Sequence, residues 1–330
     1  MNTIKKTKWG IIGCGKIAHK FAQDLSTVPD ALLFAVSSRS LEKAKNFGDT
    51  YNAVHCYGTY EELSKNSDID IIYIATPHVF HYENTLMCLR HKKAVLCEKP
   101  FAMNRIQVEE MIDTAKNNNV FLMEGLWTYF LPHYQYVLNA LESKEFGAVK
   151  KIKADFGFAA DFNPDERLFN KNLGGGSLLD VGIYPLFAAV SILGYPEKIE
   201  AEATLGKTGV DESCTMQLFY KNDVIASLFS SITQKTNTEA IIECEKGTIF
   251  IHSKFHEPSH LTIQKNGVSE KINFDTKTHG YSYEIIHAQK MLSQDCKEST
   301  IMSFDRSIEL ISLLDSVRNI IGLHYVNNTN

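Results

Sequence analysis

The feature that most constrains the fold is an apolar segment, Trp9–Ile12, that runs directly into a glycine-rich loop and then a helix-like stretch, Ile17–Leu25. In such a strand–loop–helix unit, Gly13 permits a tight turn, Gly15 lets the backbone approach a pyrophosphate, and Ala18 lets the helix pack closely on the strand. The free N–H groups of the first helical turn then favour an anion. The pattern predicts a dinucleotide site, with a glycine turn lacking any ligand as the alternative. Its residues are Gly13, Cys14, Gly15, Lys16, Ile17 and Ala18.

The next hundred or so residues repeat the alternation of apolar runs and helix-like stretches. The further predicted strands are Leu32–Ser37, Ile71–Ala75, Ala94–Cys97 and Val120–Met123. The predicted helices between them are Leu41–Tyr51, Tyr60–Lys65, Tyr82–Arg90 and Ile106–Asn117. Short joints and nearly continuous apolar strands are typical of a parallel sheet that helices cover on both faces.

The pattern changes after about residue 126. A helix is predicted over Leu131–Leu141, and the spacing of Ile308, Ile311, Leu314, Val317 and Ile321 predicts another at the end of the chain. Segments of period two lie between them, with turns such as Lys221-Asn222-Asp223 and Lys265-Asn266-Gly267. These period-two segments are Lys151–Phe158, Ile199–Leu205, Thr215–Tyr220, Val224–Ser230, Ala240–Glu243 and Leu261–Gln264.

The expected fold is therefore α/β, with an N-terminal doubly wound Rossmann domain over 1–126. An α+β domain over 127–330, built on a predominantly antiparallel open sheet, follows it and is expected to bind substrate. Because a bare apolar sheet face tends to be covered by another subunit, we expect a homodimer or higher homo-oligomer through this sheet.

Composition excludes several other classes. The 34 basic and 39 acidic residues give a net charge of −5, which argues against a nucleic-acid binder. The chain has no apolar run of about 18 residues and no apolar region behind its first charges, so neither a membrane span nor a secretory signal is expected. The seven cysteines form no CxxC pair, which favours reduced thiols in the cytoplasm. His78 and His81 lack further ligands in the pattern, so no metal site is predicted.

The end of the second predicted strand reads Val36-Ser37-Ser38-Arg39-Ser40. Enzymes that prefer NAD usually have an acidic residue here to bind the ribose 2′-hydroxyl, and this chain has none. Arg39, the serine hydroxyls and Lys43 would instead hold a 2′-phosphate, so Ser38, Arg39 and Lys43 predict NADP, with NAD less favoured. The alternative is that Arg39 is a solvated loop residue.

Three further motifs follow predicted strands or loops: Ala75-Thr76-Pro77-His78-Val79-Phe80-His81, Cys97-Glu98-Lys99-Pro100, and Gly174-Gly175-Gly176-Ser177-Leu178-Leu179-Asp180-Val181-Gly182-Ile183-Tyr184. The first two lie at carboxyl ends of parallel strands, where ligands bind in open α/β sheets. Asp180 and Tyr184 are four residues apart and would share one helix face, with a kink expected at Pro185. The alternative is that Asp180 caps the helix and Tyr184 belongs to the core.

Together these motifs resemble the glucose–fructose oxidoreductase/inositol dehydrogenase (Gfo/Idh/MocA) family over essentially the whole chain. Tyr184 stands where many members have His. With Met123-Glu124-Gly125-Leu126-Trp127 and Arg167-Leu168-Phe169, it is similar to the branch of dimeric dihydrodiol dehydrogenases and NADP-dependent D-xylose dehydrogenases. The resemblance implies that Thr76, Pro77, His81, Glu98 and Lys99 line the cofactor. His81 could equally be a helix-entry residue without such a contact.

The resemblance also implies hydride transfer between the nicotinamide C4 and a hydroxyl-bearing carbon of a sugar or vicinal diol, with Lys99, Tyr184 and Asp180 as catalytic residues. A tyrosine of ordinary pKa near ~10 is a poor base, and a nearby ammonium lowers that pKa. The sequence does not order the roles of Lys99 and Tyr184. Trp127, Phe158 and Arg167 are candidate substrate contacts, although the aromatic pair could be core and Arg167 could pair with Asp165.

Two other functions remain open at this point. A non-catalytic NAD(P)-binding regulatory protein has the same fold, but it has no need of a paired ammonium and phenol. An enzyme of this family that keeps its cofactor tightly bound and recycles it would retain that pair.

Overall fold

The structure is a computed structural model that describes residues 6–325, and it divides into two compact units. The first unit contains the chain up to Phe130 together with Thr276–Ile308. The second contains Leu131–Asp275 together with the chain from Glu309 onward. This division differs from the predicted domains 1–126 and 127–330, because the segment Thr276–Ile308 returns to the first unit.

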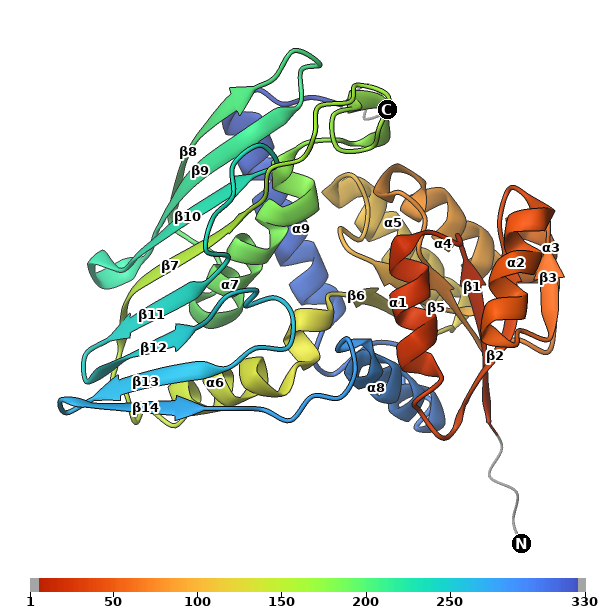
Figure 1. Ribbon diagram of the computed structural model, residues 1–330, viewed down its shortest axis with the longest axis horizontal. Coiled ribbons are helices and arrows are strands. Elements are labelled where there is room, and N and C mark those ends of the chain that lie inside the picture. Colours follow the sequence, from red (N-terminus) through yellow and green to blue (C-terminus); the bar gives the residue numbers. More distant parts are fainter. Residues whose placement is uncertain (1–5, 326–330) are drawn as a thin grey trace, which may run out of the picture. The chain divides into compact units, whose positions relative to one another are not determined.

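Six parallel strands form the sheet of the first unit, in the order β3-β2-β1-β4-β5-β6 (Figure 1). Their bounds are β1 Thr7–Ile12, β2 Ala31–Ser37, β3 His55–Tyr57, β4 Ile71–Ile74, β5 Ala94–Glu98 and β6 Leu122–Gly125. β1 pairs with β2 on one side and with β4 on the other, so the winding reverses at the strand that carries the glycine loop. Every residue of β4 and β5 is buried. The predicted doubly wound sheet is confirmed, and the short, half-exposed β3 is the strand that the pattern missed.

Helices cover this sheet in two contacting groups, α1 with α8 and α3 with α4 and α5. Their bounds are α1 Lys16–Leu25, α2 Leu41–Tyr51, α3 Tyr60–Lys65, α4 His81–Arg90, α5 Arg105–Asn118 and α8 Tyr281–Ser293, with 3₁₀ turns at η1 His78–Phe80 and η2 Trp127–Phe130. Local sequence explains where several of them begin. The Ser40 hydroxyl accepts the Lys43 N–H at the start of α2, and Thr59 forms a capping box with Glu62 at the start of α3.

α8 is attached to the first unit through one buried carboxylate. Asp24, on α1, accepts the backbone N–H groups of His279 and Gly280 at 2.9 Å and of Ser282 at 3.2 Å. Gly280 is the N-cap of α8 and has no side chain to offer, so Asp24 supplies the acceptor that the helix start requires. The Trp9 indole N–H also donates to Gln289 on α8 at 3.1 Å. These long-range contacts explain why α8 belongs to the first unit.

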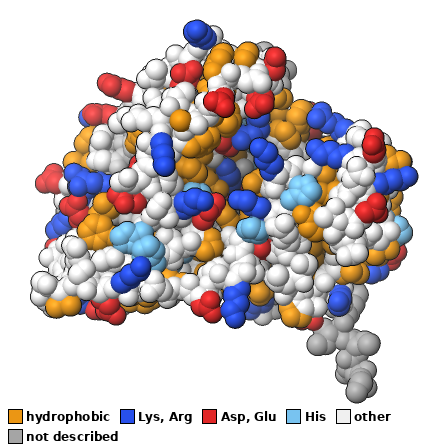
Figure 2. Space-filling view, in the orientation of Figure 1, with side chains coloured by type: hydrophobic (Ala, Val, Ile, Leu, Met, Phe, Trp, Pro, Cys, Tyr) orange, Lys and Arg blue, Asp and Glu red, His pale blue; other side chains and the backbone are white. Residues whose placement is uncertain are grey.

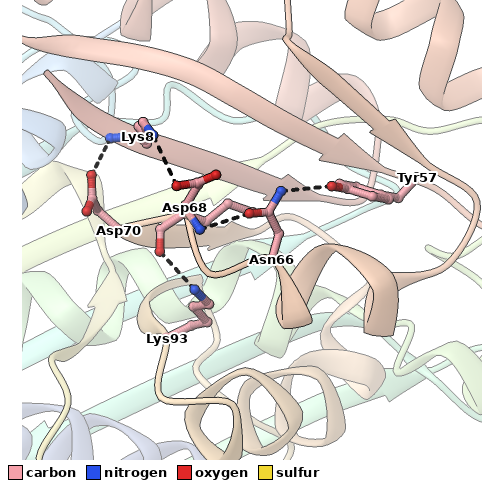
Figure 3. A network of polar contacts seen from close by, with 7 residues as sticks. Lys8, Tyr57, Asn66, Asp68, Asp70 and Lys93 are labelled. Carbon is pink, nitrogen blue, oxygen red and sulfur yellow. Dashed lines mark hydrogen bonds and ion pairs between the residues drawn. The ribbon is translucent and has the colours of Figure 1, made fainter.

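Polar contacts connect the amino ends of β1, β4 and β5, at the end of the sheet opposite the glycine loop (Figure 3). The Lys8 backbone N–H donates to Asp70 at 2.8 Å, and the Lys8 ammonium lies 3.5 Å from Asp68. The buried Lys93 ammonium donates to the Ile69 carbonyl at 3.1 Å. Burial lowers the pKa of Lys93, and the neighbouring Asp70 and Asp68 act in the opposite direction. The network fixes the entry to β4 and leaves the carboxyl ends of the strands for ligand-binding loops.

Eight strands form the sheet of the second unit, in the order β14-β13-β12-β11-β7-β10-β9-β8. Their bounds are β7 Val149–Gly157, β8 Lys198–Leu205, β9 Asp211–Phe219, β10 Ile225–Ser231, β11 Ala240–Cys244, β12 Gly247–Ile251, β13 Leu261–Lys265 and β14 Val268–Ile272. β7 and β10 pair in parallel, and all other neighbours pair antiparallel. The predominantly antiparallel second sheet is therefore confirmed, while β12 and β14 were not predicted.

One face of the second sheet is covered by helices of the same unit (Figure 1). The remaining helices are α6 Pro132–Glu142, α7 Ile183–Leu193 and α9 Phe304–Ile320, with short turns at η3 Lys171–Leu173, η4 Leu178–Gly182 and η5 Lys221–Asp223. α7 packs on β7 and β10, whose Ile152 and Ala226 are fully buried. The apolar face that we expected to meet another subunit is thus occupied within the chain. The opposite face alternates polar and apolar side chains and holds a shallow cavity of about 320 Å³ that Lys153, Gln217 and Phe229 help to line.

Within residues 6–325, one helical stretch, Lys171–Leu193, is long and apolar enough by length and composition to cross a membrane. Its most apolar window is 78% buried inside the protein, as expected of a core helix that packs against a sheet. From the sequence we expected no membrane span, because the chain has no apolar run of about 18 residues.

Charges of both signs occur among apolar side chains on the face that Figure 2 shows. Several exposed charges are paired, such as Lys153 with Glu243 and Lys150 with Glu245, both at 2.9 Å. Exposed pairs of this kind contribute little to stability, on the order of 0–1 kcal/mol each.

Candidate active site

The glycine loop between β1 and α1 has the geometry that a pyrophosphate requires. Gly13 has φ +93°, and a Cβ there would lie 2.9 Å from the Ala75 carbonyl oxygen, so only glycine fits. Gly15 is the N-cap of α1 and faces open space, and no side chain caps the helix. The first N–H groups of α1 therefore remain available to an anion. Ala18 is fully buried against the sheet, as the spacing predicted.

The other residues of this loop lie differently. Lys16 and Ile17 are exposed on the first turn of α1. Cys14 is buried, and its thiol points to the Ser37 carbonyl at 3.6 Å. Burial raises the pKa of Cys14 to about 11, although the Lys43 ammonium acts to lower it. The Cys14 thiol is therefore neutral and packed in the interior, and the charge of Lys43 acts on it.

The end of β2 carries the exposed Arg39 and no carboxylate between Ser37 and Ser40, and Lys43 follows on α2 beside Glu42. Arg39 and Lys43 are exposed, and the Arg39 guanidinium lies 5.9 Å from the centre of the Phe80 ring. Burial raises the pKa of Tyr60, and Arg39 beside it acts to lower it. Ser40 differs from expectation, because its hydroxyl is used as the N-cap of α2. Ser38 is almost buried, so Arg39 and Lys43 are the groups best exposed to a 2′-phosphate.

The loops after β4 and β5 are tied together by His81. This side chain is 1% exposed, and its two ring nitrogens lie 2.8 Å from the carbonyl oxygens of Thr76 and Pro100. This arrangement fits a role for His81 in positioning the two loops. It fits direct contact with a cofactor less well. Thr76 is itself held by the Asn84 amide at 3.3 Å, and Pro77 is the N-cap of the 3₁₀ turn that follows.

Lys99 stands at the carboxyl end of β5, half-buried, and its peptide bond to Pro100 is cis. The preceding Glu98 is buried and accepts a short hydrogen bond from the Tyr73 hydroxyl. Burial raises the pKa of Glu98, while the Tyr73 hydrogen bond and the Lys99 ammonium lower it. Glu98 is therefore turned toward the interior of the sheet, and Lys99 is the charged group that this strand end presents.

Glu124 is a site residue to which the sequence patterns assigned no role. It lies on β6, is 2% exposed, and accepts the Phe101 backbone N–H at 3.0 Å. Burial raises the pKa of Glu124 to about 7, against the lowering effects of the Ser307 hydroxyl and the Phe101 N–H. Because Phe101 follows Lys99 by two residues, Glu124 anchors the loop that carries Lys99. Its sequence signals are a charged residue inside an otherwise apolar strand and its place in the motif from Met123 to Trp127.

Trp127, a candidate substrate contact, packs inside the first unit. It is 5% exposed and stacks on Tyr281 of α8, with ring centres 4.4 Å apart. Both residues belong to the first unit, so Trp127 is part of its core.

In the second unit, the triple glycine closes a tightly packed loop before Asp180 and Tyr184. A Cβ on Gly175 would lie 2.6 Å from the carbonyl oxygens of Arg167 and Leu168. A π-helical turn, η4, spans Leu178–Gly182, and α7 follows without a break. Pro185 therefore lies shortly after the π-helical turn, and that turn is the irregularity that we expected at Pro185.

Asp180 and Tyr184 are both held by neighbours in this unit. The Arg167 guanidinium donates to Asp180 at 2.9 Å, so Arg167 pairs with Asp180 and not with Asp165. The Tyr184 ring is 6% exposed and lies 5.7 Å from Phe156 and 4.8 Å from His256.

Phe158 is half-buried, 6.3 Å from the Phe156 ring, which puts it near this group of rings. Phe156 and His256 had no role in the sequence-based predictions. His256 lies on the loop between β12 and β13, and no pattern in the chain connects it with Tyr184.

The candidate residues thus form two sets. The first unit brings together the glycine loop, Arg39, Lys43, Thr76 and Lys99 along the carboxyl edge of its sheet. The second unit brings together Asp180, Tyr184, Arg167 and Phe158, so the two proposed proton-transfer residues belong to different units. Within the described part of the chain, no group of three or more His, Cys, Asp or Glu side chains is placed to hold a metal ion.

Two family models match the chain. One is described as an oxidoreductase family with an NAD-binding Rossmann fold and matches residues 7–126; the other is the GFO/IDH/MocA C-terminal domain and matches residues 134–250. The chain is 41% identical to a trans-1,2-dihydrobenzene-1,2-diol dehydrogenase of Xenopus tropicalis, covering 97% of this chain and 99% of the relative. It is 33% identical to the Homo sapiens protein of that name, covering 96% and 98%.

Solved structures show the same fold. A 3-ketoreductase from Actinomadura kijaniata, solved with NADP and TDP-benzene, is 25% identical with a TM-score of 0.86, over 96% of this chain and 98% of that one. An aldose–aldose oxidoreductase from Caulobacter crescentus is 24% identical with a TM-score of 0.88, over 96% and 97%, and this likeness concerns the fold alone.

Proposed function

Because the chain belongs to the GFO/IDH/MocA oxidoreductase family, as its motifs predicted, we propose that it is an NADP-dependent dehydrogenase of a sugar or vicinal diol. It would transfer a hydride between the nicotinamide and the hydroxyl-bearing carbon. The observation that carries this proposal is the similarity, over nearly the whole chain, to proteins named as diol dehydrogenases. The open glycine loop and Lys99, on one edge of the first sheet, support it.

The residues of the first unit fit NADP. Gly15 and the uncapped start of α1 would receive the pyrophosphate, and Arg39 with Lys43 would receive the 2′-phosphate. The absence of a carboxylate between Ser37 and Ser40 supports NADP over NAD. When bound, the cofactor supplies the hydride acceptor or donor, and the similar 3-ketoreductase that was solved with NADP agrees with this choice.

In the proposed mechanism, oxidation of the alcohol requires a group that takes the hydroxyl proton as the hydride leaves. Tyr184 acts as the general acid/base, and the Lys99 ammonium favours its phenolate form and stabilises charge on the substrate oxygen. Asp180, which Arg167 keeps oriented, directs the substrate hydroxyls. Phe158 is the proposed aromatic wall of the substrate site.

The test is a panel of aldoses and vicinal diols, assayed at the reduced-nicotinamide absorbance band with NADP and with NAD. Tyr184→Phe and Lys99→Met should each lower kcat by about 10²–10⁴-fold. Tyr195→Phe and Lys92→Met, which change exposed residues of the same types, serve as controls. Near-normal kcat in Tyr184→Phe, or equal use of NAD and NADP, would overturn the assignment.

The domain roles and the assembly are part of the same proposal. Residues 1–126 would bind the dinucleotide, and 127–330 would bind substrate and form the contact between subunits. The uncovered face of the eight-stranded sheet, with Phe229 and Ile241 among polar side chains, is the surface proposed for a homodimer. A monomeric mass by light scattering at micromolar concentration would count against it. All seven cysteines are free thiols, which supports a reducing, cytoplasmic location.

A further inference from the structure

Asp211, the first residue of β9, lies against the start of the helical segment that carries Asp180 and Tyr184. Its side chain is fully buried, and its Oδ2 accepts the Leu178 backbone N–H at 2.6 Å and the Ser177 hydroxyl at 2.8 Å. The Ser177 hydroxyl lies 3.0 Å from that of Ser230 on β10, which can donate to it. Asp211 thus supplies the acceptor for the Leu178 N–H, the first of the helical segment, which no side-chain cap of that segment accepts.

The loop on the other side of Asp211 approaches it too closely for residue 176 to carry a side chain. Gly176 has φ +122°, and a Cβ there would lie 2.0 Å from the Asp211 Oδ1 atom. The hydroxyl of Tyr325, near the end of the described chain, donates to the Gly175 carbonyl at 2.8 Å. The loop is therefore held from two distant parts of the sequence, immediately before the segment that begins at Leu178.

We propose that Asp211 is a positioning residue for the hydride-transfer reaction, and that its carboxylate sets the placement of Asp180 and Tyr184 through the π-helical turn. The turn and α7 run without interruption from Leu178 to Leu193, so a shift at Leu178 is passed on to both side chains. The inference rests on the proposed function only for the roles of Asp180 and Tyr184.

The charge of Asp211 matters to this role. Burial raises its pKa to about 6, against the lowering effects of the Ser177 hydroxyl and the Leu178 N–H. The ionisable groups that its charge reaches are Cys214 on β9 and Tyr325, and Tyr325 is in turn influenced by Arg318 and Asp180. An ionised carboxylate accepts hydrogen bonds more strongly than a neutral acid. The start of the segment is therefore held more firmly as the pH rises through about 6.

The test compares Asp211→Asn with Asp155→Asn. The asparagine at 211 keeps one acceptor oxygen and removes the charge. Asp155 is a half-buried carboxylate on β7 that accepts the Thr238 N–H at 2.8 Å, so its substitution is matched in type. We expect Asp211→Asn to lower the single-turnover rate of hydride transfer about tenfold, as for one weakened charge-assisted hydrogen bond, with the KM for NADP unchanged. The wild-type rate should show a step near pH 6 that Asp211→Asn lacks and Asp155→Asn retains.

A second readout does not depend on turnover. In ¹³C-tyrosine-labelled protein that carries His256→Gln, which removes the imidazole 4.8 Å from the Tyr184 ring, the Tyr184 resonance, identified with Tyr184→Phe, should move near pH 6 and should stay fixed once Asp211→Asn is added. A wild-type rate together with a moving resonance in Asp211→Asn would overturn the inference. If the wild type turns over no substrate, the proposed function fails, and the resonance still decides the role of Asp211.

Should Asp211→Asn fail to fold, Ser177→Ala takes its place, because it keeps the carboxylate and the Leu178 bond. Loss of the hydroxyl removes an interaction that lowers the Asp211 pKa. The step should therefore move to higher pH, and the rate should fall below that of the wild type by less than tenfold. An unchanged rate and an unmoved step in Ser177→Ala would contradict the inference.

Discussion

Replacing Glu124 by Gln should make the protein more stable at neutral pH. The Glu124 carboxyl is buried, and its pKa rises from an ordinary 4.5 to about 7. The ionised form is therefore disfavoured in the folded state. Below pH 4.5 the Glu124 carboxyl is protonated in both the folded and the unfolded state, so it does not lower the free energy of unfolding. As the pH rises to 7, the unfolded chain ionises first, and the free energy of unfolding decreases. Above pH 7 the loss is complete.

The size of this loss follows from the two pKa values. A tenfold difference in proton affinity corresponds to about 1.4 kcal/mol, so the change from 4.5 to about 7 corresponds to about 3 kcal/mol. The substituted glutamine side chain would keep an oxygen for the Phe101 N–H and carry no charge at any pH. For a unit of this size the midpoint temperature changes by about 2–4 °C per kcal/mol. Glu124→Gln should thus melt roughly 6–12 °C above the wild type at pH 8 and nearly with it at pH 4.5.

Calorimetry or circular dichroism between pH 4.5 and 8 measures this difference. Glu109→Gln is the matched control, because Glu109 is 41% exposed and paired with Arg105 on the surface of the same unit. Its difference from the wild type should stay small across the range. If the gap between Glu124→Gln and the wild type is the same at pH 5 and at pH 8, Glu124 does not change its charge there, and the argument from burial is wrong.

Three further predictions concern single side chains. Arg39→Leu should raise the KM for NADP about tenfold or more and leave that for NAD nearly unchanged; an equal change for both in steady-state kinetics would refute a 2′-phosphate contact. Asp24→Ala should lower the free energy of unfolding by about 2–4 kcal/mol in denaturant titrations, because three N–H groups at the start of α8 lose their acceptor, and Asp24→Asn should recover part of it. Glu284→Leu should raise the free energy of unfolding by about 1–3 kcal/mol, because neither buried oxygen of the Glu284 carboxyl has a hydrogen-bond partner in the described chain. A melting temperature below that of the wild type would contradict this.

Local signals in the sequence were sufficient for much of the first unit. The run Trp9–Ile12 and the following glycines predicted β1, its loop and α1, because turn geometry and helix packing depend on residues close in the chain. The antiparallel strands were predicted for the same reason, through turns such as Asn222-Asp223, where both residues have φ 58°.

What the sequence could not supply depends on distant contacts. α8 carries a buried Glu284 and begins at a glycine, and its start is stabilised by Asp24 from α1. Nothing near residue 280 indicates that acceptor. The support of Leu178 by Asp211 is equally non-local, and the π-helical turn changes the spacing that an α-helix would give Asp180 and Tyr184.

The return of Thr276–Ile308 to the first unit has a consequence for how the protein is made. A ribosome releases the glycine loop early, yet α8 leaves the exit tunnel only after the whole eight-stranded sheet has been synthesised. Until then Trp127 lacks the Tyr281 ring that covers it, and Asp24 lacks the N–H groups that it accepts. A fragment that ends at residue 130 would expose the Trp127 ring and the Asp24 carboxylate. The nucleotide-binding half is therefore not a module that a single cut in the chain can release.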